Sequence, residues 1–236
     1  KIEKERETQS LRRQSEFRVS LVGYTNAGKS TLFKALTGSN VYIQDQLFAT
    51  LDTTIRKLDL DTSHTILLSD TVGFIRKLPH NLVASFKSTL KEVLEADLIV
   101  MVLDMSSPQI KDHVDTITDV LKEMSADSIP VIHVLNKVDL ISDGNMIEKL
   151  KRSFPGSVII SADKHLRLSD LTKKIMNEME SNYQTVDLEF SYDDGKTIAN
   201  VQQGVEVLER AYEEEGVKLK IRGSRSRINQ IMGSID

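Results

Sequence analysis

Apolar residues recur along most of the chain in two spacings. Every-second-residue or continuous apolar runs predict strands at 17–23, 55–60, 65–69, 98–103, 131–135 and 158–160. Helical spacing predicts helices at 29–37, 82–96, 110–124, 146–150 and 168–179. Strands that alternate with helices across 17–183 predict an α/β domain with a doubly wound, mostly parallel sheet and helices on both faces. The two strands within 55–69 should form one antiparallel pair at its edge.

The segments outside this domain are shorter and less regular. Residues 1–16 are polar and carry both signs of charge, which predicts the end of a solvated linker helix. A strand at 186–191, a helix at 196–215 and a strand at 217–222 predict a small C-terminal β-α-β domain over 186–222. We expect 223–236 to form a flexible tail.

Composition narrows the function classes. The chain of 236 residues contains no cysteine, which excludes disulfides, thiolate metal sites and cysteine nucleophiles. A net charge of −4 argues against a general nucleic-acid binder. No apolar run reaches the ~20 residues that a membrane-spanning helix requires. Because the chain starts at Lys1 rather than at a methionine, we expect a fragment of a longer protein.

The most informative stretch follows the first strand and matches the phosphate-binding loop G-x-x-x-x-G-K-[ST]. Backbone N–H groups at such a helix N-terminus suit a phosphate, and we expect the helix's Thr31 to contribute as well. The lysine can reach the β- and γ-phosphates, and the serine hydroxyl can bind Mg²⁺. The loop consists of Gly23, Tyr24, Thr25, Asn26, Ala27, Gly28, Lys29 and Ser30.

A second phosphate motif, D-x-x-G, ends the strand at 65–69 and consists of Asp70, Thr71, Val72 and Gly73. The aspartate can hold Mg²⁺, and the glycine N–H can bond the γ-phosphate and so sense its loss. The following residue is Phe74, where related enzymes often place a glutamine that orients water. Either turnover is low, or another group or a partner positions the water; helix and loop residues near Thr71 and Arg76 are possible helpers. His80, close behind this motif, is a further candidate functional residue.

The tetrapeptide Asn136, Lys137, Val138 and Asp139 indicates guanine. An aspartate carboxylate accepts bonds from guanine N1–H and N2–H₂, whereas adenine would leave it unpaired. This argues against an ATP-using kinase or ATPase. The asparagine can brace the P-loop, and the lysine stem can lie over the purine. Backbone N–H groups at Ser161, Ala162 and Asp163 can face guanine O6. In the loop at 40–54, Thr50, Thr53 and Thr54 are all candidates for a further Mg²⁺ ligand.

The chain resembles the HflX-type ribosome-associated GTPases of the Obg-HflX superfamily. The resemblance rests on residues 23–33, on Leu47 to Asp52, and on the stretch from Asp70 to His80. It implies that Thr50 is the loop ligand, and that a hydrophobic residue at Phe74 is normal for the family. It adds the loop residues around that threonine to the nucleotide site: Phe48, Ala49, Thr50, Leu51 and Asp52.

The resemblance also implies a function. The catalytic residues would be Lys29, Thr50 and Gly73, and the metal ligands Ser30, Thr50 and Asp70. The cofactors would be GTP or GDP and Mg²⁺, and the partner of the full-length protein the large ribosomal subunit. We expect a cytoplasmic, monomeric GTPase with slow intrinsic turnover that lacks the family's N-terminal domain in this fragment. The alternative is a guanine-nucleotide-dependent scaffold with little or no hydrolysis.

Overall fold

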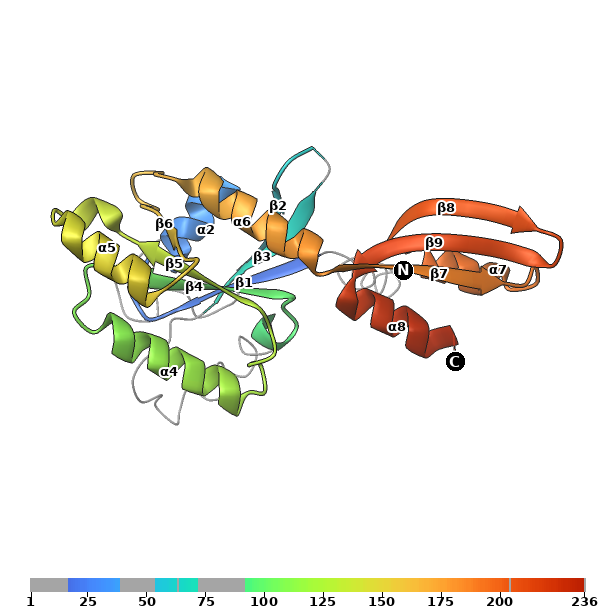
Figure 1. Ribbon diagram of the computed structural model, residues 1–236, viewed down its shortest axis with the longest axis horizontal. Coiled ribbons are helices and arrows are strands. Elements are labelled where there is room, and N and C mark those ends of the chain that lie inside the picture. The colour runs from blue at the N-terminus through green and yellow to red at the C-terminus, as the bar shows by residue number, and fades with distance from the viewer. Residues whose placement is uncertain (1–16, 39–53, 63, 72–91, 204, 236) are drawn as a thin grey trace. The chain divides into compact units, whose positions relative to one another are not determined.

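A computed structural model describes residues 17–38, 54–62, 64–71, 92–203 and 205–235 of the chain (Figure 1). The chain divides into two compact units, which are described separately below. The main unit spans Arg18–Met176, and the small unit contains the described residues from Asn177 onward. The predicted linker helix at 1–16 and most of the helix at 82–96 lie outside the described residues.

The main unit is built on a sheet with the strand order β2-β3-β1-β4-β5-β6. Strand β1 pairs in parallel with β4, β4 with β5, and β5 with β6, whereas β2 and β3 form the expected antiparallel edge pair. The predicted fold class is therefore confirmed. The strands are β1 (Phe17–Gly23), β2 (Thr54–Asp59), β3 (Thr65–Asp70), β4 (Leu98–Asp104), β5 (Val131–Asn136) and β6 (Val158–Ile159).

Helices cover both faces of this sheet, with α2 and α6 on one side and α4 on the other (Figure 1). The helices are α2 (Lys29–Thr37), α4 (Ile110–Glu123), the short 3₁₀ turn η2 (Val138–Leu140), α5 (Gly144–Ser153) and α6 (Leu168–Ser181). Among the described residues, no helix has both the length and the apolar character needed to cross a bilayer.

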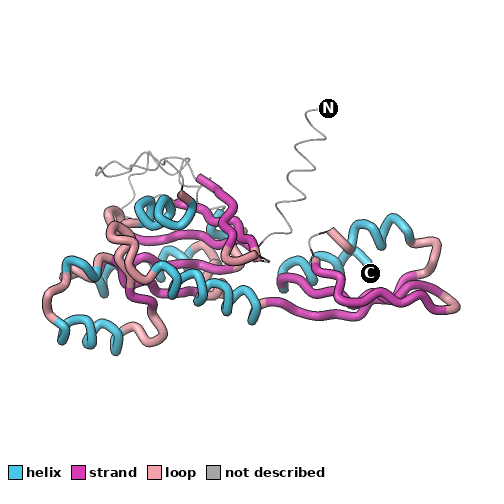
Figure 2. Tube along the Cα trace, turned by 90° about the horizontal axis from the view of Figure 1, so that it is seen from above, coloured by secondary structure: helices cyan, strands magenta, loops and turns pink. Residues whose placement is uncertain are grey.

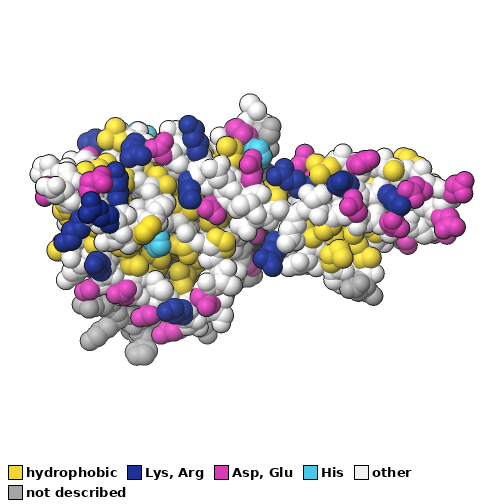
Figure 3. Space-filling view, in the orientation of Figure 1, with side chains coloured by type: hydrophobic (Ala, Val, Ile, Leu, Met, Phe, Trp, Pro, Cys, Tyr) yellow, Lys and Arg dark blue, Asp and Glu magenta, His cyan; other side chains and the backbone are white. Residues whose placement is uncertain are grey.

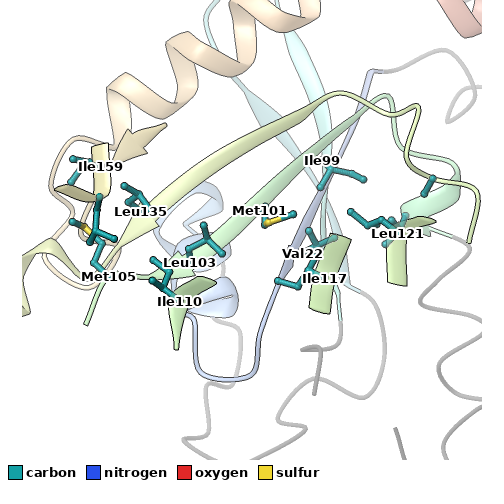
Figure 4. Packing of buried hydrophobic residues seen from close by; sticks show 13 residues of the cluster. Val22, Ile99, Met101, Leu103, Met105, Ile110, Ile117, Leu121, Leu135 and Ile159 are labelled. Atoms are coloured by element: carbon teal, nitrogen blue, oxygen red, sulfur yellow. The ribbon is translucent and has the colours of Figure 1, made fainter. Parts of the chain in front are cut away.

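The core of the main unit explains why β4 reads as an unbroken apolar run. Residues 98–103 are all buried, because helices pack against both faces of the sheet. Alternate residues Ile99, Met101 and Leu103 share one buried cluster with the α4 residues Ile110, Ile117 and Leu121 (Figure 4). This packing fixes the parallel strands in register, so the polar residues that follow each strand meet at one edge of the sheet.

The small unit is a three-stranded antiparallel sheet with the order β7-β9-β8. Helices α7 and α8 lie on one side of it (Figure 2), and their apolar residues join those of β7 and β9 in a separate core. The elements are β7 (Tyr183–Phe190), α7 (Gly195–Val201), β8 (Glu206–Glu213), β9 (Gly216–Ser224) and α8 (Arg225–Ile235).

The other face of this small sheet carries charged side chains of both signs, which form ion pairs between neighbouring strands. Lys218 on β9 forms ion pairs with Glu189 on β7 at 3.1 Å and with Glu213 on β8 at 3.0 Å. Figure 3 shows basic and acidic side chains interspersed on the visible face of this unit, with acidic ones at the β8–β9 turn.

Two sequence predictions for the small unit were wrong. The helix predicted at 196–215 ends at Val201, and residues 206–213 form strand β8. The segment is rich in good helix formers, but pairing with β9 from Glu206↔Arg222 to Glu213↔Gly216 overrides local propensity. The tail predicted at 223–236 contains helix α8, because its Ile228 and Ile231 are buried against the sheet.

The hairpin between β8 and β9 depends on a glycine, which yields a first prediction. A Cβ at Gly216 would lie 2.1 Å from the carbonyl oxygen of Phe190, which is backbone and cannot move aside. We expect Gly216→Ala to destabilise the small unit by about 1–3 kcal/mol. Faster hydrogen exchange of the β9 amides would report this loss.

The matched control is Gly144→Ala in α5, where an added Cβ meets nothing within 4 Å. We expect it to leave the stability of the small unit unchanged. Equal exchange rates in Gly216→Ala and the parent chain would contradict the hairpin described here.

Candidate nucleotide-binding site

The P-loop connects β1 to α2 and is shaped by two crowded glycines. Gly28 caps α2 in the left-handed conformation with φ 94°, a region that side chains rarely adopt. At Gly23, a Cβ would lie 2.5 Å from the carbonyl oxygen of Val102 on the neighbouring strand. The loop therefore folds back tightly between a strand end and a helix N-terminus, which is the geometry that the sequence motif predicts.

Lys29 lies beneath this loop and is 6% exposed. Its Nζ donates hydrogen bonds to the carbonyl oxygens of Gly23 and Tyr24, each at 3.1 Å. Burial lowers the pKa of the Lys29 amine to about 8, while the charge of Asp70 acts in the opposite direction. The loop thus holds a desolvated amine whose charged form anionic phosphates would favour.

Asp70 ends β3 and is fully buried beside this lysine. Its carboxylate and the hydroxyl of Ser30 at the start of α2 are the hard oxygen ligands that Mg²⁺ prefers, so these residues fit a magnesium ion. The next residue, Thr71, donates its hydroxyl proton to the carbonyl oxygen of Leu21 at 2.6 Å. That proton is therefore engaged with β1, which argues against Thr71 as the group that orients water.

Asn136 joins the P-loop to the guanine motif. Its side chain is 2% exposed and donates through Nδ2 to the carbonyl oxygen of Ala27 at 2.9 Å. Its Oδ1 accepts a hydrogen bond from the backbone N–H of Ala162 at 3.0 Å. A Cβ at Gly28 would lie 2.3 Å from this same Nδ2, so the second P-loop glycine also makes room for the asparagine.

Lys137 follows in the left-handed conformation with φ 66°. Its Nζ donates to Asp104 Oδ2 at 2.7 Å. Burial raises the pKa of the Asp104 carboxyl, but hydrogen bonds from Lys137 and Ser106 outweigh this and hold the pKa below its usual value. This contact was not expected from the sequence. The signal that could have indicated it is an acidic residue at the end of a buried strand, next to the strand that leads into the guanine motif.

The backbone amides of the loop after β6 make contacts within the protein that the sequence did not predict. The N–H of Ala162 is engaged by Asn136, and the N–H of Ser161 donates to the carbonyl oxygen of Leu166 at 3.2 Å. The Ala162 N–H therefore braces Asn136, and the Ser161 N–H closes the turn to Leu166, so neither amide is left for a base. Asp163 forms an exposed ion pair with Lys164 at 2.7 Å.

Asp139 is exposed in η2 at the same edge of the sheet. Lys164 lies within electrostatic reach of it: the pKa of Lys164 is raised, first by its hydrogen bond to Asp163 and to a smaller extent by the charge of Asp139. The carboxylate that is predicted to read guanine thus lies beside the loop that braces Asn136.

Another contact not expected from the sequence involves Tyr24 of the P-loop. Its ring stacks on His113 of α4, with centroids 3.9 Å apart and planes at 10°. Several predicted residues lie outside the described residues, and their roles stay predictions: Phe48, Ala49, Thr50, Leu51, Asp52, Thr53, Val72, Gly73, Phe74, Arg76 and His80.

Residues 18–137 match a family described as "50S ribosome-binding GTPase". Among individual relatives, GTPase HflX of Gluconacetobacter diazotrophicus is 41% identical over 94% of this chain and 49% of that protein. GTPase HflX of Escherichia coli is 37% identical over 94% of this chain and 53% of that protein. The chain thus spans about half the length of the curated relatives it matches.

Solved structures resemble the fold of the main unit. A GTP-binding protein from Sulfolobus solfataricus in complex with GDP has a TM-score of 0.55 and 28% identity, covering 74% of this chain and 55% of that one. Era in complex with MgGDPNP and nucleotides of 16S ribosomal RNA has a TM-score of 0.56 and 26% identity, covering 69% and 56%.

The family match covers the P-loop, Asp70 and the start of the guanine motif, which are the segments that meet at the edge of the sheet. The chain therefore belongs to the family described as 50S ribosome-binding GTPases, and over most of its length it is similar to GTPases HflX.

Proposed function

We propose that this chain binds GTP together with Mg²⁺, hydrolyses it slowly to GDP and phosphate, and acts as a nucleotide-controlled switch in a protein that associates with the large ribosomal subunit. The observation that carries the proposal is the Asn136 side chain, which bonds both the P-loop and the loop after β6. Phosphate-binding and base-binding segments therefore share one crevice at the carboxyl ends of parallel strands, where such folds bind nucleotides.

The base is guanine in this proposal, and Asp139 selects it. The Asp139 carboxylate accepts the N1–H and N2–H₂ donors of guanine, a pair that adenine does not have. The Lys137 stem covers the purine plane. The GTPase family assignment and the Sulfolobus solfataricus relative solved with GDP support this choice.

The phosphates lie on the P-loop, where Lys29 neutralises their charge. In its buried position the amine has a pKa of about 8, so bound phosphates would keep it protonated above that pH. Ser30 and Asp70 would hold Mg²⁺, which would supply positive charge to neutralise the phosphates. By resemblance, Thr50 completes the metal site and Gly73 senses the γ-phosphate.

Intrinsic turnover is slow because Phe74 brings no polar atom to the attacking water, and the Thr71 hydroxyl proton is engaged by β1. A partner must supply or order the missing group. The alternative is a scaffold that binds guanine nucleotide with little or no hydrolysis. Lys29 and Asp70 are both present and lie close enough to interact electrostatically, which favours the GTPase.

The match of residues 18–137 to a family described as ribosome-binding supports a ribosomal setting, as does the similarity to proteins named GTPase HflX. We propose that the whole protein is cytoplasmic and monomeric and that the large subunit stimulates its hydrolysis. Within this chain, residues 17–183 would be the GTPase domain, and the small unit would be a separate C-terminal domain.

Asp139→Asn tests the base assignment. An amide at this position cannot accept both guanine donors, so the affinity for GDP should fall at least about 30-fold, or about 2 kcal/mol. Affinity for XDP should rise, because the 2-oxo group of xanthine suits an amide donor. Calorimetric titration with GDP, XDP and ADP measures all three.

Asp143→Asn is the matched control, because Asp143 caps α5 by accepting from the Asn145 N–H, and asparagine caps helices equally well. Its GDP affinity should equal that of the parent. Unchanged GDP affinity in Asp139→Asn would exclude Asp139 as the guanine reader.

The rate of GTP hydrolysis tests the proposed nucleotide-controlled switch. Phosphate release from GTP by this chain alone should be far below the ~1–100 s⁻¹ of efficient phosphoryl-transfer enzymes. For the full-length protein it should rise on addition of large ribosomal subunits, with Lys29→Ala as the inactive control. Fast release without a partner would contradict the role given to Phe74, and no release in any condition would favour the scaffold.

A further inference from the structure

We propose that Asp104 is a positioning residue for the nucleotide base: it holds Lys137 in place before the nucleotide arrives and thereby sets the affinity for guanine nucleotides. The inference rests on the proposed function, because it assigns a task to a residue beside the same crevice. It adds a residue from β4 to a base site otherwise drawn from β5 and the loop after β6.

The Asp104 carboxylate is oriented from both sides. Its Oδ1 accepts hydrogen bonds from the N–H of Ser106 at 2.8 Å and from the Ser106 hydroxyl at 2.6 Å. Its Oδ2 accepts from Lys137 Nζ at 2.7 Å. One oxygen is therefore tied to the turn after β4, which leaves the other directed at the lysine.

This ion pair is largely removed from solvent, unlike most surface pairs. The side chains of Lys137 and Asp104 are 29% and 19% exposed. Charge-assisted hydrogen bonds in such surroundings are shorter and stronger than neutral ones. Asp104 stays ionised at neutral pH, because the hydrogen bonds from Lys137 and Ser106 outweigh the effect of burial and keep its pKa low.

The backbone of Lys137 is also fixed. It adopts a left-handed conformation directly after Asn136, whose side chain is bonded at both ends. From there the side chain reaches from the end of β5 to the end of β4, and the next strand in the sheet is β1, which leads into the P-loop. The lysine side chain is thus held at both ends, by its backbone and by its bond to Asp104.

A free lysine side chain loses rotamer entropy when it becomes ordered. The bond to Asp104 removes that freedom in the nucleotide-free protein, so guanine meets a preorganised surface.

A purely structural role for the pair fits the geometry less well. Strands β4 and β5 are already joined over six positions, from Ile99↔Val131 to Asp104↔Asn136. The backbone N–H of Met105 continues this pairing by donating to the carbonyl oxygen of Asn136 at 2.9 Å. An additional bond between side chains is not needed to hold the strand ends together.

The test compares Asp104→Asn with the parent chain by calorimetric titration. We expect the affinity for GDP to fall about tenfold. The affinity for IDP should fall by the same factor, because the lysine covers the ring and not the 2-amino edge. The affinity for pyrophosphate should stay within about twofold of the parent, since the P-loop is untouched.

Two further variants distinguish a positioning role of Asp104 from a general disturbance of the site. Ser106→Ala removes one of the two bonds to the other carboxylate oxygen and keeps the one from the backbone N–H, so GDP affinity should fall less than in Asp104→Asn. In a Lys137→Met background, Asp104→Asn should have no further effect, because the group that Asp104 positions is already absent.

Unchanged GDP affinity in Asp104→Asn would overturn the inference, as would an equal loss of GDP and pyrophosphate affinity or an undiminished loss in the Lys137→Met background. Failure of the parent chain to bind GDP at all would instead overturn the proposed function. The two failures are therefore distinguishable in the same experiment.

Discussion

One buried carboxamide, that of Asn136, connects the parts of this site. It donates to a P-loop carbonyl 109 residues earlier in the chain and accepts from an amide 26 residues later. Only a side chain with both a donor and an acceptor can satisfy both backbone groups, and a buried polar group left unpaired costs about 1–3 kcal/mol. The constraint extends to Gly28, because any side chain there would occupy the space of the amide nitrogen.

Around this carboxamide the chain arranges its charges before any ligand is bound. Lys29 lies under the P-loop near Asp70, and Lys137 is paired with Asp104. Each lysine is partly or fully desolvated and is held by oxygen atoms of the protein. Preorganised charges of this kind reduce the reorganisation that accompanies binding, so the site is suited to recognise a phosphate at one end and a purine at the other.

The sequence predicted the main unit well and the small unit less well. Continuous apolar runs such as 98–103 identify buried parallel strands with little ambiguity, and the motifs that follow them must then meet at one edge. The prediction for residues 206–213 was wrong because their composition favours a helix. Their structure depends instead on pairing with β9, a tertiary contact that local propensity does not encode. Helix α8 was missed because its apolar residues, Ile228 and Ile231, are sparse among small polar ones.

The nucleotide site was likewise predicted only in part. Motif spacing predicted Lys29, Asp70 and Asn136, whose roles follow from residue type and strand order. It did not predict Asp104 or the stack of Tyr24 on His113, because these pairs are set by which strand and helix become neighbours. Nor did it predict that Ala162 would use its amide to hold Asn136, since a two-residue pattern specifies a position and not a partner.

The most direct test of the account is the affinity of an Asn136→Ala variant for GDP and, separately, for pyrophosphate, measured by calorimetry in a variant whose hydrogen exchange in β4 and β5 matches the parent. If the carboxamide joins the two halves of the site, both affinities fall, because the P-loop carbonyl and the Ala162 amide each lose their partner. Retention of parental pyrophosphate affinity would show that the P-loop does not depend on Asn136 and would contradict the central claim.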